Sequence, residues 1–210
     1  MVAVVAMVSS TRSNVRTTMV KHGASPVSSA VPTSSPPASN GAESDTTSTT
    51  AVSSGPRDRA GQAAAINEVL QQTHLSRQQV HDAADDVLHC GSGHGLDADA
   101  RTLGDAAETR EQLADQVQAL PADALDDGQH LLDLLTAALR NSAQADRELA
   151  AWAQNLEDTG CEPDAATDNP HYHTSTALSE QATADKQSLL AVWNPLADEQ
   201  NLPTWQPADI

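Results

Sequence analysis

The sequence is poor in aromatic and in basic residues. Only 2% of its 210 residues are aromatic, with no Phe, and 11 Lys and Arg stand against 29 Asp and Glu, so the formal charge is −18. Nucleic-acid binding depends on Lys and Arg that displace counterions from phosphates, and anionic membranes attract the same residues. We therefore expect no nucleic-acid ligand and no direct binding of the folded domain to an anionic membrane.

Several sequence signatures of enzymes are also missing. The chain has no G-x-S-x-G elbow, no G-x-x-x-x-G-K-[ST] loop, no G-x-G-x-x-G turn and no H-E-x-x-H helix. The Glu-x-x-His pairs of carboxylate-bridged di-iron bundles do not occur either. Carboxylates are so numerous that two carboxylates close together in the sequence do not indicate a catalytic acid–base pair. These absences favour a non-enzymatic protein without a cofactor.

The N-terminal quarter of the sequence lacks the large apolar residues of a folded core. No Leu, Ile or aromatic residue precedes Ile66, and Ser, Thr and Pro occupy 26 of the 48 positions in residues 9–56. Such a segment cannot bury enough apolar surface to offset the entropy of ordering it. We predict a disordered Ser/Thr/Pro-rich arm or tether over residues 1–57 and a folded domain over residues 58–210. The apolar residues 1–8 are either the remainder of a longer anchor or part of the arm.

From residue 58 onward, apolar residues recur every three or four positions, which is the spacing of one face of an α-helix. The pattern predicts four helices. The first covers about residues 61–90, the second ends before Pro121, the third covers about residues 128–157, and a shorter fourth runs from Leu178 to Asn194-Pro195. Such segments, joined by short connections, predict an all-α, antiparallel up-down four-helix bundle.

Each predicted helix has a seam, which is the row of apolar residues along one of its faces. Charged residues interrupt these seams at three places. Arg77, Arg110 and Asp185 occupy seam positions, and we expect them at the seam edges because burying a charge is costly. After the fourth helix, residues 202–205 are expected to fold back on the bundle as a small hydrophobic cap.

The two cysteines are the most informative pair in the sequence. Cys90 ends the first predicted helix and Cys161 follows the third, and in an up-down bundle these helices run parallel. Both sulfur atoms should therefore reach the same end of the bundle, which predicts a disulfide and an oxidising compartment. Two reduced thiols and a metal site are the alternatives.

The metal alternative depends on histidines near the cysteines. Cys90 and His94 are spaced C-x3-H, and His171 and His173 follow Cys161. These are ligand types that zinc prefers, although the spacing matches no standard zinc site.

The tryptophans are the candidates for an interaction surface. Aromatic side chains often dominate the binding energy of interfaces, and Trp152, Trp193 and Trp205 are the three in this chain. At helical spacing or in a capping tail, however, a Trp is more often a core residue.

Short segments across about residues 62–210 resemble a group of uncharacterised actinobacterial proteins. The most specific parts are the two-cysteine frame and Ala191-Val192-Trp193-Asn194-Pro195-Leu196-Ala197; the others are Ala65-Ile66-Asn67, Ala145-Asp146, Ala151-Trp152-Ala153-Gln154 and Leu202-Pro203. In that group the helical domain typically follows a membrane anchor or a regulatory domain and a Ser/Thr/Pro-rich linker, and it lies outside the membrane. The resemblance implies no activity.

Together, these features predict a non-enzymatic, extracytoplasmic helical domain, secreted or tethered to the envelope. It would act as a cell-envelope interaction or sensor module for an unidentified protein or small molecule. The alternative function is a metal-binding module that uses Cys90, His94, Cys161, His171 and His173, and the alternative location is the cytoplasm.

Overall fold

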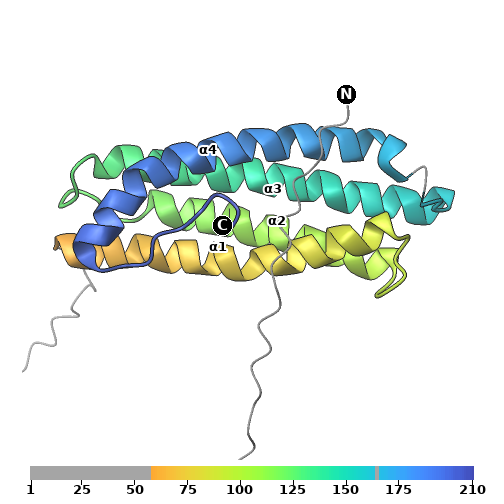
Figure 1. The fold of residues 1–210 in the computed structure, drawn as a ribbon, viewed down its shortest axis with the longest axis horizontal. Helices are drawn as coiled ribbons and strands as arrows, with labels where there is room; N and C mark the ends of the chain where they lie inside the picture. Colours follow the sequence, from red (N-terminus) through yellow and green to blue (C-terminus); the bar gives the residue numbers. More distant parts are fainter. Residues whose placement is uncertain (1–57, 164–165) are drawn as a thin grey trace, which may run out of the picture. The chain divides into compact units, whose positions relative to one another are not determined.

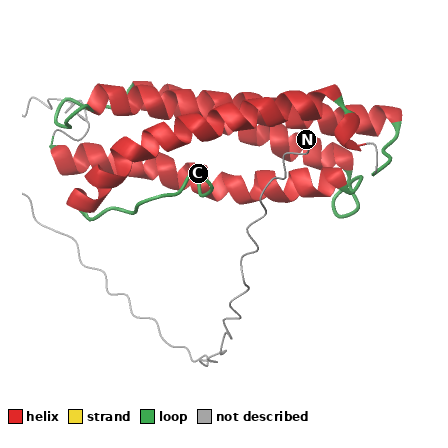
Figure 2. Cartoon of the chain, turned by 45° about the horizontal axis from the view of Figure 1, so that its top comes forward, coloured by secondary structure: helices red, strands yellow, loops and turns green. Residues whose placement is uncertain are grey.

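A computed structural model describes residues 58–163 and 166–210, and the predicted arm over residues 1–57 lies outside them. The described residues form four long α-helices, α1 (Arg59–Leu88), α2 (Leu96–Gln118), α3 (Gly128–Thr159) and α4 (Pro170–Gln200), and a 3-10 helix, η1 (Ala166–Asp168). Successive helices run in opposite directions (Figure 1). No strand occurs in these two ranges (Figure 2). The predicted all-α four-helix bundle is confirmed.

None of the described helices is both long enough and apolar enough to span a bilayer. Each is amphipathic, with its buried face turned toward the other helices.

α4 begins earlier than the apolar pattern predicted. Its first residue is Pro170, whose fixed φ suits the first turn of a helix. The side chain of Asn169 caps this end by accepting a hydrogen bond of 2.9 Å from the backbone N–H of His171. The apolar pattern did not predict the first turns of α4 because these turns are rich in His, Thr and Ser rather than in large apolar residues.

α4 also continues past Pro195 to Gln200, so the predicted end at Asn194-Pro195 is wrong. A proline in a helix interior removes one backbone hydrogen bond. Here the lost bond is offset by packing, because Leu196 and Ala197, just after the proline, are both buried in the core. The C-terminal part of α4 turns toward the start of α1 (Figure 1), where Arg59 donates to Glu199 at 2.8 Å.

The apolar core consists of two separate clusters along the bundle. The larger cluster contains Ile66, Leu70, Leu113, Leu131, Leu135, Leu189, Trp193 and Ile210, among others. The smaller one contains Ala83, Val87, Leu103, Trp152, Ala153, Leu156 and Ala166. The smaller cluster lies at the end of the bundle where α1 passes into α2.

Between the two clusters, each helix contributes a buried or partly buried charged side chain: Arg77 of α1, Arg110 of α2, Asp146 of α3 and Lys186 of α4. We call these four residues the central charged layer. Arg110 and Asp146 form an ion pair whose side chains are only 3% and 5% exposed.

The prediction that Arg110 lies at a seam edge is therefore wrong, because α3 supplies it with a buried carboxylate partner. Arg77 and Asp185 are only partly buried.

The residues after α4 fold back and lie between α1 and α4 (Figure 1). The indole N–H of Trp193 donates to the backbone oxygen of Pro203 at 3.2 Å. Asn194 and Trp205 exchange two hydrogen bonds of 3.0 Å between the Asn side chain and the Trp backbone. At the end of the segment, the side chain of Ile210 is 1% exposed. We call residues 202–210 the tail.

Candidate metal centre

The predicted disulfide joins Cys90 to Cys161, with Cα atoms 5.5 Å apart. Cys90 follows the last turn of α1 and Cys161 follows α3, so the bridge connects two helices that run parallel. It fixes one end of the bundle, next to the connection between α1 and α2.

The disulfide occupies both sulfur atoms, so the five-residue metal site expected from Cys90, His94, Cys161, His171 and His173 does not form. His171 instead contacts the carboxylate of Glu148, at 2.8 Å. His173 lies against Tyr172, with the ring centroids 6.1 Å apart. Of these five residues, only His94 belongs to a cluster of metal-ligating side chains within residues 58–163 and 166–210.

The tryptophans form no common surface. Trp152 and Trp193 are 0% exposed, and the indole N–H of Trp152 donates to the backbone oxygen of Ala166 at 2.9 Å. The interpretation of these two residues as an interaction surface is therefore wrong. Trp205 is partly buried against the larger cluster and lies against His74, with ring centroids 5.1 Å apart and the ring planes tilted by 42°.

The connection between α1 and α2 is a tight turn of backbone in the left-handed region. Cys90 has φ 59° and Gly91 has φ 68°, a conformation that glycine adopts at little cost. A Cβ atom on Gly91 would lie 2.6 Å from the backbone nitrogen of Leu96, so a side chain does not fit there. The turn brings the end of α1 back over the start of α2.

Asp86, in the last turn of α1, holds this turn in place. Its two carboxylate oxygens accept hydrogen bonds of 2.7 Å from the backbone N–H groups of Gly93 and His94. The pKa of Asp86 is lowered, chiefly because the N–H of His94 donates to the charged carboxylate. Asp86 is therefore a preorganised anion whose position is set by the backbone.

Asp99 faces Asp86 from the first turn of α2. It is 2% exposed, and its Oδ2 atom has no hydrogen-bond partner among the described residues. Burial, then the charge of Asp86, then a side-chain hydrogen bond that protonated Asp99 donates to Asp86 raise the pKa of Asp99 to about 6. A buried carboxylate oxygen without a donor is costly, so a cation at this position would relieve the cost.

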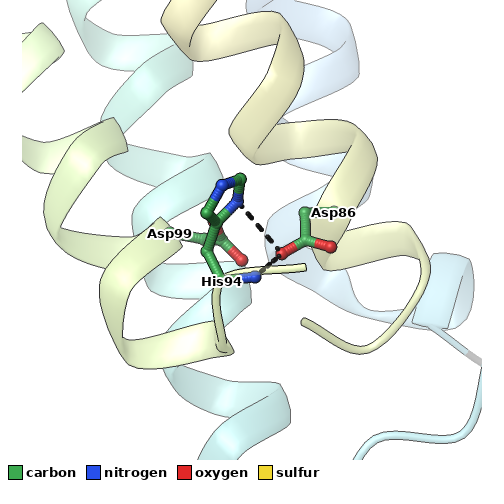
Figure 3. A group of neighbouring side chains, drawn as sticks. All are labelled: Asp86, His94 and Asp99. Carbon is green, nitrogen blue, oxygen red and sulfur yellow. Dashed lines mark hydrogen bonds and ion pairs between the residues drawn. The ribbon is translucent and has the colours of Figure 1, made fainter. Parts of the chain in front are cut away.

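His94 completes the cluster from the turn itself. Its Nδ1 atom lies 3.6 Å from Oδ2 of Asp86 and 3.9 Å from Oδ1 of Asp99, and the imidazole points toward both carboxylates (Figure 3). The candidate ligand atoms of all three residues lie within 4.8 Å of one another. Two ligands at about 2.1 Å from one ion are at most about 4.2 Å apart, so both histidine distances already satisfy this limit.

A cleft of about 510 Å³ between α1 and α2 opens beside the cluster and is lined by His94 and Asp99. Its other lining residues include Asp82 and Asp105, and none is Lys or Arg. This lining gives a cation a negatively charged approach to the three ligands.

The unpartnered carboxylate leads to a prediction for the metal-free protein. The folded pKa of Asp99, about 6, exceeds its ordinary value of 3.8, so the folded state binds this proton more tightly than the unfolded state does. Its contribution to stability therefore falls as the pH rises from about 4 to about 6 and stays low above that. In EDTA at pH 7, we expect Asp99→Asn to raise the free energy of unfolding by about 1–3 kcal/mol.

Urea unfolding followed by circular dichroism at pH 4 and pH 7 would test this prediction. The increase in the free energy of unfolding should be present at pH 7 and nearly absent at pH 4, where Asp99 is already protonated. A variant that is less stable than the wild type at pH 7 would show that Asp99 has a partner in solution.

The sequence contained one signal for this cluster that is visible only in retrospect. Asp86 and Asp99 lie on either side of the glycine-rich segment from Gly91 to Gly95, and a tight turn there must bring them together. The signal was hidden because 29 acidic residues make such pairs common.

No known protein family, no curated protein and no solved structure shows significant similarity to this chain.

Proposed function

We propose that this chain is a non-enzymatic module that binds a divalent metal ion at Asp86, His94 and Asp99. The observation that carries the proposal is the buried carboxylate of Asp99, whose Oδ2 atom has no hydrogen-bond partner among the described residues and whose Oδ1 atom lies 3.9 Å from the imidazole of His94. A bound cation would neutralise the two carboxylates and supply the partner that Asp99 lacks.

The donor set favours a first-row transition metal such as Zn²⁺. Imidazole suits such ions, whereas Ca²⁺ and Mg²⁺ prefer oxygen ligands throughout. The side chain of His94 is 71% exposed, which leaves room for water molecules or a further ligand on the ion.

The position of the site supports a structural or sensing role. Asp86 lies in the last turn of α1, Asp99 in the first turn of α2, and His94 in the turn between the two helices. A metal ion held by all three would tie the two helices together beside the disulfide. Metal binding would therefore make this end of the bundle more rigid. A partner molecule that contacts this end would respond to the change in rigidity.

We further propose that the domain works outside the cytoplasm, as an envelope interaction or sensor module. The disulfide supports this location because such bonds persist in oxidising compartments. Its partner would be a protein or a small molecule.

Zinc titration of the full chain, prepared without a histidine tag, tests the proposed site. Isothermal titration calorimetry should give one Zn²⁺ per chain. At a free zinc concentration of about 100 times Kd, the free energy of unfolding should rise by about 2.7 kcal/mol. Ca²⁺ and Mg²⁺ at the same concentration should give a much smaller rise.

Two variants make the titration specific. His94→Ala should weaken zinc binding by at least about 10–100-fold, the range seen even for loss of an outer partner of a ligand. His89→Ala is the matched control, because the His89 side chain is similarly exposed, at 63%, and its Nδ1 atom contacts Asp85 rather than the metal ligands. The proposal is wrong if zinc binds the His94 variant as tightly as the control, or if no stoichiometric binding occurs.

A further inference from the structure

The cleft between α1 and α2 extends well beyond the metal centre. Its lining runs along α2 from Ala98 to Thr109 and along α1 from Ala83 back to Ser76. The stretch of α2 alone is about 16 Å long. α1 packs less closely against α2 than α3 does, and the small side chains of Ala83, Ala98 and Ala106 leave the space between the two helices open. We call this long cleft the α1–α2 groove.

Three carboxylates line the α1–α2 groove, and none of its lining residues is Lys or Arg. Asp99 lies at the end nearest the metal centre, Asp105 lies farther along α2, and Asp82 lies on α1. Asp99 indicates a ligand, because it is 2% exposed and its Oδ2 atom has no hydrogen-bond partner among the described residues. A ligand with positive charge along its length would supply that partner and neutralise the other two carboxylates.

The hydroxyl groups of the α1–α2 groove are arranged to accept hydrogen bonds from a ligand rather than to donate them. Each hydroxyl already donates at 2.9–3.0 Å to the backbone oxygen three or four residues earlier in its own helix: Ser76, Thr102 and Thr109. What remains for a ligand is the lone pairs of each hydroxyl oxygen. With the three carboxylates, these oxygens make the lining rich in acceptors, so a matching ligand is rich in donors.

A linear polyamine has the charge, the donors and the shape that this lining requires. Its ammonium groups donate hydrogen bonds and accept none, whereas a basic peptide would also bring backbone carbonyls, for which the lining offers few side-chain donors. Asp99 and Asp105 lie about 9 Å apart along the axis of α2. An extended triamine with spacers of three and four carbons spans about 11 Å, and its methylene groups would lie on the alanine methyl groups.

We propose that the α1–α2 groove binds a linear aliphatic polyamine, with one terminal ammonium group at Asp99 and the other ammonium groups at Asp82 and Asp105. This site goes beyond the proposed metal function and does not depend on it, because the polyamine binds the metal-free chain. Asp99 serves both ligands, so the polyamine and the metal ion exclude each other. The polyamine concentration would therefore regulate how much metal the chain holds.

The test is isothermal titration calorimetry of the full chain with spermidine, after treatment with EDTA and dialysis to remove both metal and chelator. In about 0.15 M NaCl, long-range attraction to a chain of charge −18 is largely screened, and one spermidine should bind per chain. The control cation is hexaamminecobalt(III), which has the same charge in a compact shape. It should bind at least about fivefold more weakly, because it reaches one carboxylate of the groove and not the others.

Three variants that remove one charge each assign the binding to the groove. Asp99→Asn should weaken spermidine binding at least about tenfold, through loss of a buried charge-assisted hydrogen bond. Asp105→Asn should weaken it about two- to fivefold, as expected for an exposed ion pair, and its exposed position leaves the fold intact. Asp133→Asn is the matched control, because Asp133 is an exposed aspartate of α3 outside the groove, and the affinity should not change.

The outcomes separate this proposal from the metal site. Zinc binding without spermidine binding would overturn the polyamine proposal and leave the metal site in place, and spermidine binding without zinc binding would do the reverse. If both bind, saturating zinc should abolish spermidine binding. The polyamine proposal is also overturned if hexaamminecobalt(III) or trilysine binds as tightly as spermidine, or if Asp105→Asn binds spermidine as tightly as Asp133→Asn.

Discussion

Replacing Asp146 with alanine is expected to lower the free energy of unfolding by about 3–5 kcal/mol, the usual cost of removing one partner of a buried ion pair. The loss in the free energy of unfolding should be at the upper end of this range. Without Asp146, the Arg110 side chain, 3% exposed, would keep its charge beside two other cations and no carboxylate. Urea unfolding followed by circular dichroism at pH 7 measures the effect.

The matched control replaces both partners with apolar residues of similar size. Asp146→Leu combined with Arg110→Met should leave the stability unchanged or raise it by about 1–4 kcal/mol, since neither charge then needs burial. A double variant as unstable as Asp146→Ala would indicate that the loss comes from packing rather than from an unpaired charge.

Loss of the disulfide is expected to lower the free energy of unfolding by about 4 kcal/mol. The bridge closes a loop whose ends are 71 positions apart, and the main effect of such a link is to reduce the entropy of the unfolded chain. The double variant Cys90→Ser, Cys161→Ser should therefore stay helical but unfold at a lower urea concentration.

The wild type in reductant provides the comparison for this variant. Both samples should unfold at the same urea concentration, and the oxidised wild type should be more stable than either. If the double variant equals the oxidised wild type in stability, the sulfur atoms are not bonded in solution.

The helical bundle was predictable because its cause is local. Apolar residues at helical spacing mark each buried face, and glycines such as Gly160 mark where a helix ends. The disulfide followed from the same pattern, because up-down connectivity places Cys90 and Cys161 at one end. The early start of α4 was not predictable from this spacing, since its first turns contain few large apolar residues.

The buried ion pair was not predictable from helical spacing alone. A seam identifies Arg110 as core-facing but does not say which residue of another helix lies opposite. That depends on how far α2 and α3 slide along each other, which the packing of the whole core decides. The metal centre was not predictable for a similar reason. Asp86 and Asp99 come together only because the turn between them is tight, and the helical spacing does not show that.

The division of the apolar core by the central charged layer bears on how the bundle comes apart. Each cluster occupies its own part of the bundle. We therefore expect amide hydrogen exchange to report two cooperative units that share the same helices. The unit with Trp193 should open first, because the bond between Cys90 and Cys161 holds the end with Trp152.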